Sequence, residues 1–128
     1  MSKAARFCET LAFPEGKDVI IQLHGGTRAL FDFYKHMPNV QGFQDDSGGR
    51  GWAAEAWMEP ETPFFGYGGG IGPENVAEVV RAIEKVCPGD FWIDMESRIR
   101  TEDRFDLAKC RAVCETLVRE QLVKTQGF

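Results

Sequence analysis

The sequence has no apolar run that could cross a membrane, no excess of basic residues and no cysteine pattern with zinc spacing. A membrane helix needs about 20 consecutive apolar residues, which no segment here approaches. The formal net charge is -5, which argues against a nucleic-acid partner. The cysteines lack Cys-x-x-Cys spacing and nearby histidines; they are Cys8, Cys87, Cys110 and Cys114. We therefore expect a cytoplasmic protein with no metal, no cofactor, no membrane contact and no nucleic-acid partner.

What the sequence does have is an alternation of strand and helix patterns. Short apolar runs at 18–25, 39–45, 63–68 and 90–95 are typical of buried strands. Helical periodicity lies beside and between them, at 2–13, 27–37, 73–86 and 103–124. Strands that alternate with helices usually pair in parallel. The order predicts one α/β domain of four parallel strands alternating with helices.

Two of the predicted helices carry more detailed expectations. The helix after Pro73 is expected to end at Gly89, through the positive φ that glycine tolerates. The last helix, from about Asp103 to Lys124, is expected to turn one face inward. That face carries Leu107, Cys110, Val113, Cys114, Leu117 and Leu122.

Polar residues and glycines follow every predicted strand. Ligands bind at the carboxyl ends of the strands in parallel α/β sheets, so these residues are the candidate site. Adjacent Asp45 and Asp46 point to opposite faces of a strand, and only one of them can enter such a site. The candidates in chain order are His24, Asp45, Asp46, Ser47, Gly48, Gly49, Gly68, Gly69, Gly70, Asp94, Glu96, Ser97 and Arg98.

The three consecutive glycines at 68–70 stand between a strand and a helix. Bare main-chain amides beside a helix N-terminus suit a phosphate group. Ser97, in the loop after the next strand, is placed to donate to the same phosphate. A tight turn that binds nothing would also use glycines, and the pattern alone leaves both interpretations open.

Four segments of the chain occur in an order that resembles a known family. They are VIIQLHG (19–25), QDDSGGRG (44–51), PFFGYGGGIGPENVAEVV (63–80) and WIDMES (92–97). Together they resemble motifs in the later strands of phosphoribosylanthranilate isomerase, a TIM barrel of tryptophan biosynthesis. The Gly-x-Pro-Glu-Asn-Val match is the most specific of these motifs.

The resemblance implies an Amadori rearrangement of a phosphorylated sugar derivative. It implies that Asp46, or its neighbour Asp45, is the general acid. It also implies a phosphate site at Gly69, Gly70 and Ser97, under a loop shaped by Gly48 and Gly49. The family's general base, a cysteine in a Lys-x-Cys-Gly strand, has no counterpart in this sequence. Glu96 and Arg98 stand where the family has a serine and a glycine.

The sequence thus leaves three classes of function open: an isomerase, a module that binds or sequesters a phosphorylated small molecule, and an interaction protein whose site has decayed. Four strands are half of an eight-stranded barrel, and a half-barrel leaves two open edges. We expect a homodimer that closes a barrel and so removes both edges. The alternative is an open, flavodoxin-like sheet whose edges are covered by its own helices.

Overall fold

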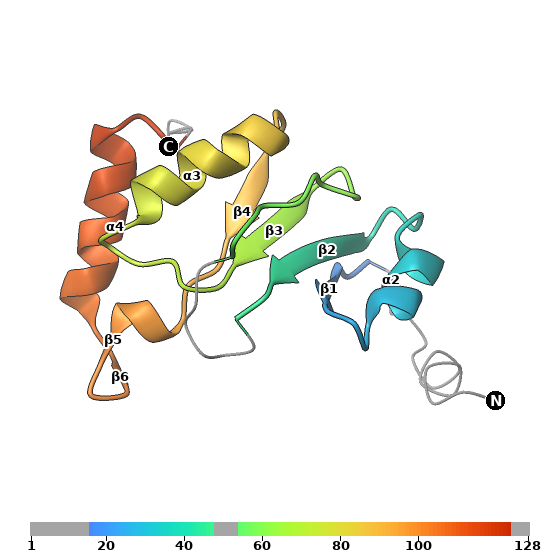
Figure 1. Ribbon diagram of the computed structural model, residues 1–128, viewed down its shortest axis with the longest axis horizontal. Helices are drawn as coiled ribbons and strands as arrows, with labels where there is room; N and C mark the ends of the chain where they lie inside the picture. Colours follow the sequence, from blue (N-terminus) through green and yellow to red (C-terminus); the bar gives the residue numbers. More distant parts are fainter. Residues whose placement is uncertain (1–15, 48–53, 124–128) are drawn as a thin grey trace.

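The computed structural model describes residues 16–47 and 54–123 of the chain. Their framework is a parallel four-stranded sheet with the strand order β1-β2-β3-β4 (Figure 1). The strands are β1 (Val19–Leu23), β2 (Val40–Asp45), β3 (Phe65–Gly68) and β4 (Phe91–Ile93). The predicted α/β class and the four parallel strands are confirmed. The predicted helix at 2–13, Cys8, Gly48 and Gly49 lie outside the described residues.

Helices connect or follow three of the four strands. Helix α2 (Arg28–Tyr34) leads from β1 to β2, α3 (Val76–Val86) leads from β3 to β4, and α4 (Leu107–Arg119) packs on α3. The described part of the connection from β2 to β3, residues 54–64, contains no helix. No helix in the described ranges combines the length and apolar character needed to cross a bilayer.

The strand order runs straight along the sheet without reversing. Each right-handed crossover therefore moves in the same direction, which places the helices on one face, as in one segment of an α/β barrel. A flavodoxin-like sheet would instead reverse its order and carry helices on both faces. The described residues form an open sheet of half-barrel type, with β1 and β4 at its edges.

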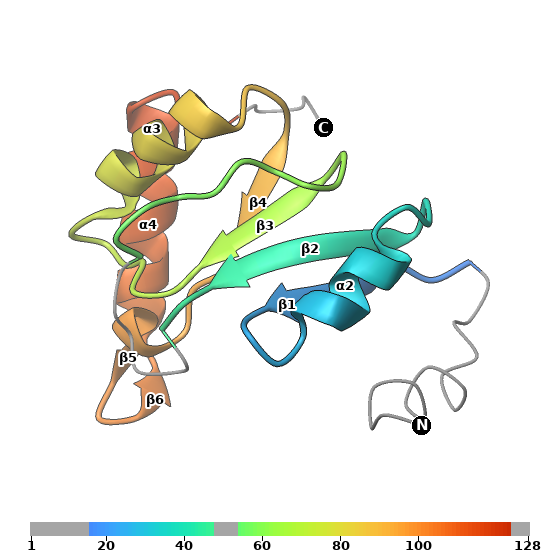
Figure 2. The same ribbon diagram turned by 45° about the vertical axis from the view of Figure 1, so that its right-hand side comes forward.

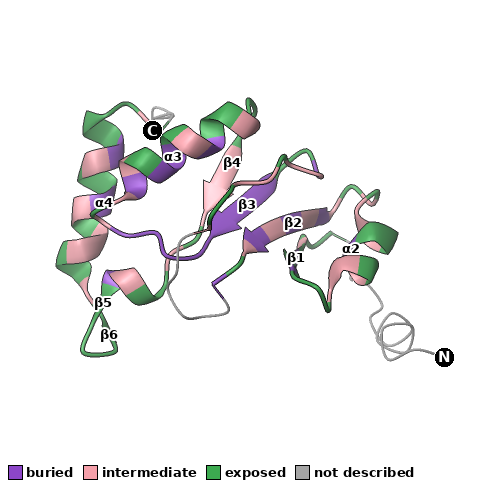
Figure 3. Cartoon of the chain, viewed as in Figure 1, coloured by how far each residue is buried: buried purple, intermediate pink, exposed green. Residues whose placement is uncertain are grey.

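The two faces of the sheet differ in what covers them. The register aligns Ile21, Gly42, Phe65 and Phe91 in one row, and this row faces the helices. Phe31 of α2 lies against Gly42, and Phe31, Phe65 and the buried valines of α3 belong to one core cluster. Figure 3 shows β3 buried between its less buried neighbours. The core therefore lies between the sheet and its single helical layer.

The opposite face carries a second row, in which Gln22, Phe43, Gly66 and Trp92 are aligned. The rings of Phe43 and Trp92 stack with centroids 5.1 Å apart. Trp92 also donates from Nε1 to Gln41 Oε1 at 3.1 Å. None of these side chains belongs to the core cluster. This face therefore has its own aromatic contact, separate from the helical side.

Residues 54–64 take the place of a helix over β2 and β3. Gln44 donates from Nε2 to the Ala56 carbonyl and accepts from the Met58 amide, both at 2.9 Å. The hydroxyl of buried Tyr67 donates to the Met58 carbonyl at 2.9 Å. Burial, with a smaller contribution from Cys87, raises the pKa of Tyr67 above its usual range. The segment is thus fixed to the sheet by hydrogen bonds instead of helical packing.

The last helix corrects two of the sequence expectations. It begins at Leu107 instead of Asp103, because Asp106 caps it by accepting from the Ala108 and Lys109 amides. A 3-10 turn, η1 (Ser97–Ile99), and a short hairpin, β5 (Arg100–Thr101) with β6 (Arg104–Phe105), occupy the preceding residues. On α4, Val113 and Leu117 are buried, but Leu107 is 74% exposed and Cys114 is exposed as well. The inward face is therefore narrower than the pattern predicted.

The end of α3 also differs from expectation. Gly89 does not have a positive φ, so it is not the residue that ends the helix. Cys87, at the C-cap, has already left the helical region with φ -124° and ψ 92°. Pro88 follows directly, and the residue before a proline is restricted to extended conformations. Proline, not glycine, accounts for this helix end.

Candidate functional site

A small pocket lies at the carboxyl ends of β2, β3 and β4, where the sequence placed its candidate rim. It is lined by side chains and backbone of Asp45, Ser47, Gly69, Gly70, Ile71, Asp94, Glu96 and Ser97. The loops after β3 and β4 therefore meet, because the two strands are paired neighbours. Of the candidates from the sequence, the structure brings together Asp45, Ser47, Gly69, Gly70, Asp94, Glu96 and Ser97.

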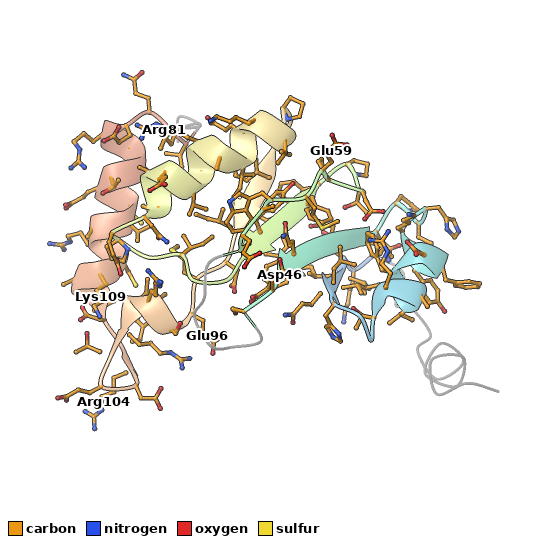
Figure 4. All side chains as sticks on the ribbon, viewed as in Figure 1. Asp46, Glu59, Arg81, Glu96, Arg104 and Lys109 are labelled. Atoms are coloured by element: carbon orange, nitrogen blue, oxygen red, sulfur yellow. The ribbon has the colours of Figure 1, made fainter. Side chains whose placement is uncertain are left out.

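The structure shows which of the two adjacent aspartates enters the pocket, a choice that the sequence left open. Asp45 lines the pocket and accepts from the Ser47 amide at 2.9 Å and the Ser47 hydroxyl at 2.6 Å. Asp46 is not among the lining residues; it accepts from Gln44 Nε2 at 2.9 Å. Figure 4 shows Asp46 beyond the end of β2 and Glu96 in the loop after β4. Of the two adjacent aspartates, only Asp45 therefore lines the pocket.

Carboxylates dominate the electrostatics of the pocket. Asp45 ends β2 and Asp94 directly follows β4, on either side of Gly68, which has no side chain to separate them. Partial burial raises the pKa of Asp94, and the negative charges of Asp45 and Glu96 raise it further. A carboxyl group with a raised pKa holds its proton more firmly, which is the property that a general acid needs.

The glycine loop owes its shape to backbone conformation and to one asparagine. Gly69 and Gly70 have φ values of 96° and 65°, a region where side chains other than glycine are strained. Asn75 accepts from the Gly72 amide and donates to the Gly70 carbonyl, each at 2.8 Å. Asn75 also occupies the N-cap of α3. One side chain therefore joins the glycine turn to the start of the helix.

Three other candidates lie near the pocket without lining it. Gly68 ends β3 and is buried against Phe43. Arg98 lies 3.7 Å from Glu74 at the start of α3, and Arg100 lies 3.7 Å from Glu96. His24 is exposed, and its Nδ1 accepts from the Gly26 amide at 3.1 Å. That bond fixes the turn after β1, so His24 has a local structural contact.

No family model, no curated protein and no solved structure matches this chain. Within the described residues, no group of three or more histidine, cysteine or acidic side chains is arranged to hold a metal ion.

The sequence reasoning missed two contributors to this site. Ile71 lines the pocket, and Asn75 shapes the glycine loop. Asn75 lies within the Pro-Glu-Asn-Val segment at the start of a helix, where an asparagine cap is common. That signal was present in the sequence, but only the folded loop shows that Asn75 bonds to Gly70 and Gly72.

Proposed function

We propose that the pocket at the ends of β2, β3 and β4 binds a phosphorylated sugar or a nucleotide-like small molecule. The observation that carries the proposal is the meeting of Gly69, Gly70 and Ser97 with Asp45 and Asp94 in one pocket. Glycine amides and a serine hydroxyl suit a phosphate, whereas carboxylates accept hydrogen bonds from sugar hydroxyls. A ligand with a phosphate at one end and hydroxyls at the other matches both sets.

The acidic side chains set a limit on affinity. Asp45, Asp94 and Glu96 all repel an anion at neutral pH, and Arg100 offsets part of the charge of Glu96. The raised pKa of Asp94 favours its neutral form, which lowers the repulsion. We therefore expect weak binding that strengthens when Asp94 loses its charge.

The catalytic version of the proposal is an Amadori isomerase that resembles phosphoribosylanthranilate isomerase and acts in tryptophan biosynthesis. Its general acid would be Asp45, with Asp94 as the second carboxyl group of the pocket. The second version is a module that binds the ligand without turnover, and the third is an interaction protein with a decayed site. We place the protein in the cytoplasm as a homodimer; free thiols at Cys87, Cys110 and Cys114 suit a reducing compartment.

Thermal shift with inorganic phosphate, ribose 5-phosphate and nucleoside monophosphates tests the binding proposal. A ligand at 100 times its dissociation constant stabilises the folded protein by about 2.7 kcal/mol. We expect Ser97→Asp to abolish the shift, because it adds a negative charge to the pocket. Ala29→Asp adds the same charge on exposed α2 and should keep the shift. No shift with any of these compounds, or equal shifts in the two variants, contradicts the proposal.

Turnover of phosphoribosylanthranilate, followed by its fluorescence, separates the enzyme from the binding module. We expect Asp45→Asn to lower any turnover while it leaves phosphate binding in place. A rate no higher than that of heat-denatured protein rejects the isomerase. A thermal shift with phosphate compounds would in that case still support the binding module.

A further inference from the structure

The face of the sheet opposite the helices carries the exposed side chain of Ile20, and the described sheet has two unpaired edges. Ile20 of β1 is 54% exposed on this face, and Phe43 and Trp92 are half-buried beside it. In the described sheet, β1 pairs only with β2, and β4 only with β3. Figure 2 shows β1 and β4 at opposite sides of the sheet, with β2 and β3 between them. An apolar face that ends in unpaired edges is a surface for association.

We infer that a second copy of this chain covers this face, with β4 of each copy paired in parallel to β1 of the other. This inference rests on the homodimer in the proposed function and is independent of the ligand. We call each such β4–β1 contact a seam. A two-fold axis parallel to the strands keeps all strands pointing in one direction and produces two identical seams. Eight strands then close a barrel, and no edge remains unpaired.

The aromatic pair on this face supports a closed barrel. Side chains inside an α/β barrel form layers contributed by alternate strands. Phe43 comes from β2 and Trp92 from β4. Their rings stack on each other, and the Trp92 ring covers Gly66 of the strand between them. Two copies would supply four large aromatic side chains from alternate strands to one layer. The monomer therefore already shows half of such a layer.

A groove beside the free edge of β4, on the helical side of the sheet, supports the same arrangement. An apolar groove lies between β4, α3 and the end of α4, and Phe64, Val80, Phe91, Ile93, Leu117 and Leu122 are among its lining residues. The Asp94 amide donates to the Tyr67 carbonyl, so the main chain at Asp94 faces β3. Main-chain groups of successive residues in a strand point in alternating directions. The main-chain groups of Phe91 and Ile93 therefore point to the free edge of β4. A strand added at this edge would place its apolar side chains in the groove.

Charge complementarity selects β1 as the strand that is added. Lys17 precedes β1 and Asp90 precedes β4, while His24 follows β1 and Asp94 follows β4. A parallel seam between these strands brings His24 near Asp94 at the carboxyl ends. At the amino ends it brings both Lys17 and Asp18 near Asp90. Two copies of β4 placed edge to edge would instead bring like charges together.

Light scattering on the full chain tests the arrangement, with two lysine substitutions as a matched pair. We expect a wild-type mass of twice the 14.4 kDa chain. Ile20→Lys should raise the dissociation constant about tenfold or more, because the seam would bury an unpaired charge. Phe33→Lys should leave the dimer unchanged, since Phe33 is 66% exposed on α2, away from this face.

Circular dichroism establishes that each variant is folded. If Ile20→Lys does not fold, Val123→Lys replaces it, because Val123 lines the groove and is 41% exposed. A monomeric mass for the wild-type protein overturns the inference. Ile20 would in that case be exposed, or another part of the same chain would cover it. A dimer that resists the seam substitutions, or that Phe33→Lys dissociates, overturns it as well. A thermal shift with phosphate in a monomeric variant would leave the ligand proposal standing by itself.

Discussion

At the scale of single residues, Asp94 is the carboxylate of the pocket whose negative charge is unfavourable for folding. Its pKa is raised by partial burial and by the charges of Asp45 and Glu96. A carboxyl group whose pKa is higher in the folded state binds its proton more tightly there than in the unfolded chain. Its charged form therefore lowers stability at neutral pH, and this cost disappears as the pH falls through the unfolded pKa.

We predict that Asp94→Asn stabilises the protein at pH 7 by up to about 0.5 kcal/mol. The figure is small because solvent screens the exposed part of the Asp94 side chain. The gain should vanish once the pH falls below the ordinary aspartate pKa of about 3.9, where Asp94 is protonated in the folded and the unfolded state. Urea denaturation at the two pH values measures both effects. Asp18→Asn removes an exposed carboxylate outside the pocket and should show no such gain. A loss of stability in Asp94→Asn at pH 7 would contradict the electrostatic account.

Glu61 shows the opposite behaviour. Arg28 donates to both of its oxygens at 2.6 Å, and Lys35 approaches one of them at 3.1 Å. The hydrogen bond from Arg28 is the main reason that the pKa of Glu61 is lowered. The resulting stability is present above the unfolded pKa of Glu61 and is lost as the pH falls through the folded value.

We predict that Glu61→Gln costs about 1 kcal/mol at pH 7, since the ion pair is partly exposed. The difference from wild type should shrink as the buffer is acidified. Glu59→Gln is the matched control, because Glu59 lies on the same segment but is exposed (Figure 4). Chemical denaturation measures the free energy of unfolding for all three proteins. Equal stability of the three at pH 7 would show that the ion pair does not hold residues 54–64.

At the scale of elements, Gly66 lets β3 fit beneath the aromatic pair of its neighbours. A Cβ atom at this position would lie 2.2 Å from the Trp92 ring, far inside any normal contact distance. Trp92 is further held by stacking on Phe43 and by its bond to Gln41. The ring therefore has little room to move aside, and the close packing of β2, β3 and β4 on this face depends on the missing side chain.

We predict that Gly66→Ala lowers the free energy of unfolding by about 2 kcal/mol or more, because inserting a methyl group here forces a shift of the ring. Gly25→Ala is the control: Gly25 has open space around its Cβ position and no positive φ. Urea denaturation followed by tryptophan fluorescence measures both variants. A Gly66→Ala protein as stable as wild type would mean that Trp92 has another position available.

The elements also show what the sequence could predict. Strand and helix positions followed from apolar periodicity, which is a local property of the chain. The hairpin before α4 was missed because it depends on positive φ values at Glu102 and Asp103, residue types that do not demand them. The meeting of the glycine loop with Ser97 followed from strand order. The position of Asp45, and not Asp46, in the pocket could not be predicted from strand order. It depends on the hydrogen bonds that Gln44 and Ser47 make in the folded loop.

At the scale of the whole molecule, the parallel strand order decides which backbone groups lack partners. The Val19 amide donates to Asn39, so Val19 faces β2 and the amides of Ile20 and Gln22 face the free edge. The same alternation turns Phe91 and Ile93 outward from β4. Within the described sheet these four amides have no strand partner, and in the proposed barrel they pair across the two β1–β4 contacts.

Hydrogen exchange therefore gives a test that needs no substitution. We predict that the amides of Ile20, Gln22, Phe91 and Ile93 exchange slowly at high protein concentration and faster on dilution, as the dimer dissociates. The amides that face into the sheet, such as those of Val19 and Asp94, should change much less, because their partners are in the same chain. Exchange at the edges that is fast at every concentration would mean that the strands remain unpaired, and the half-barrel would then be the complete fold.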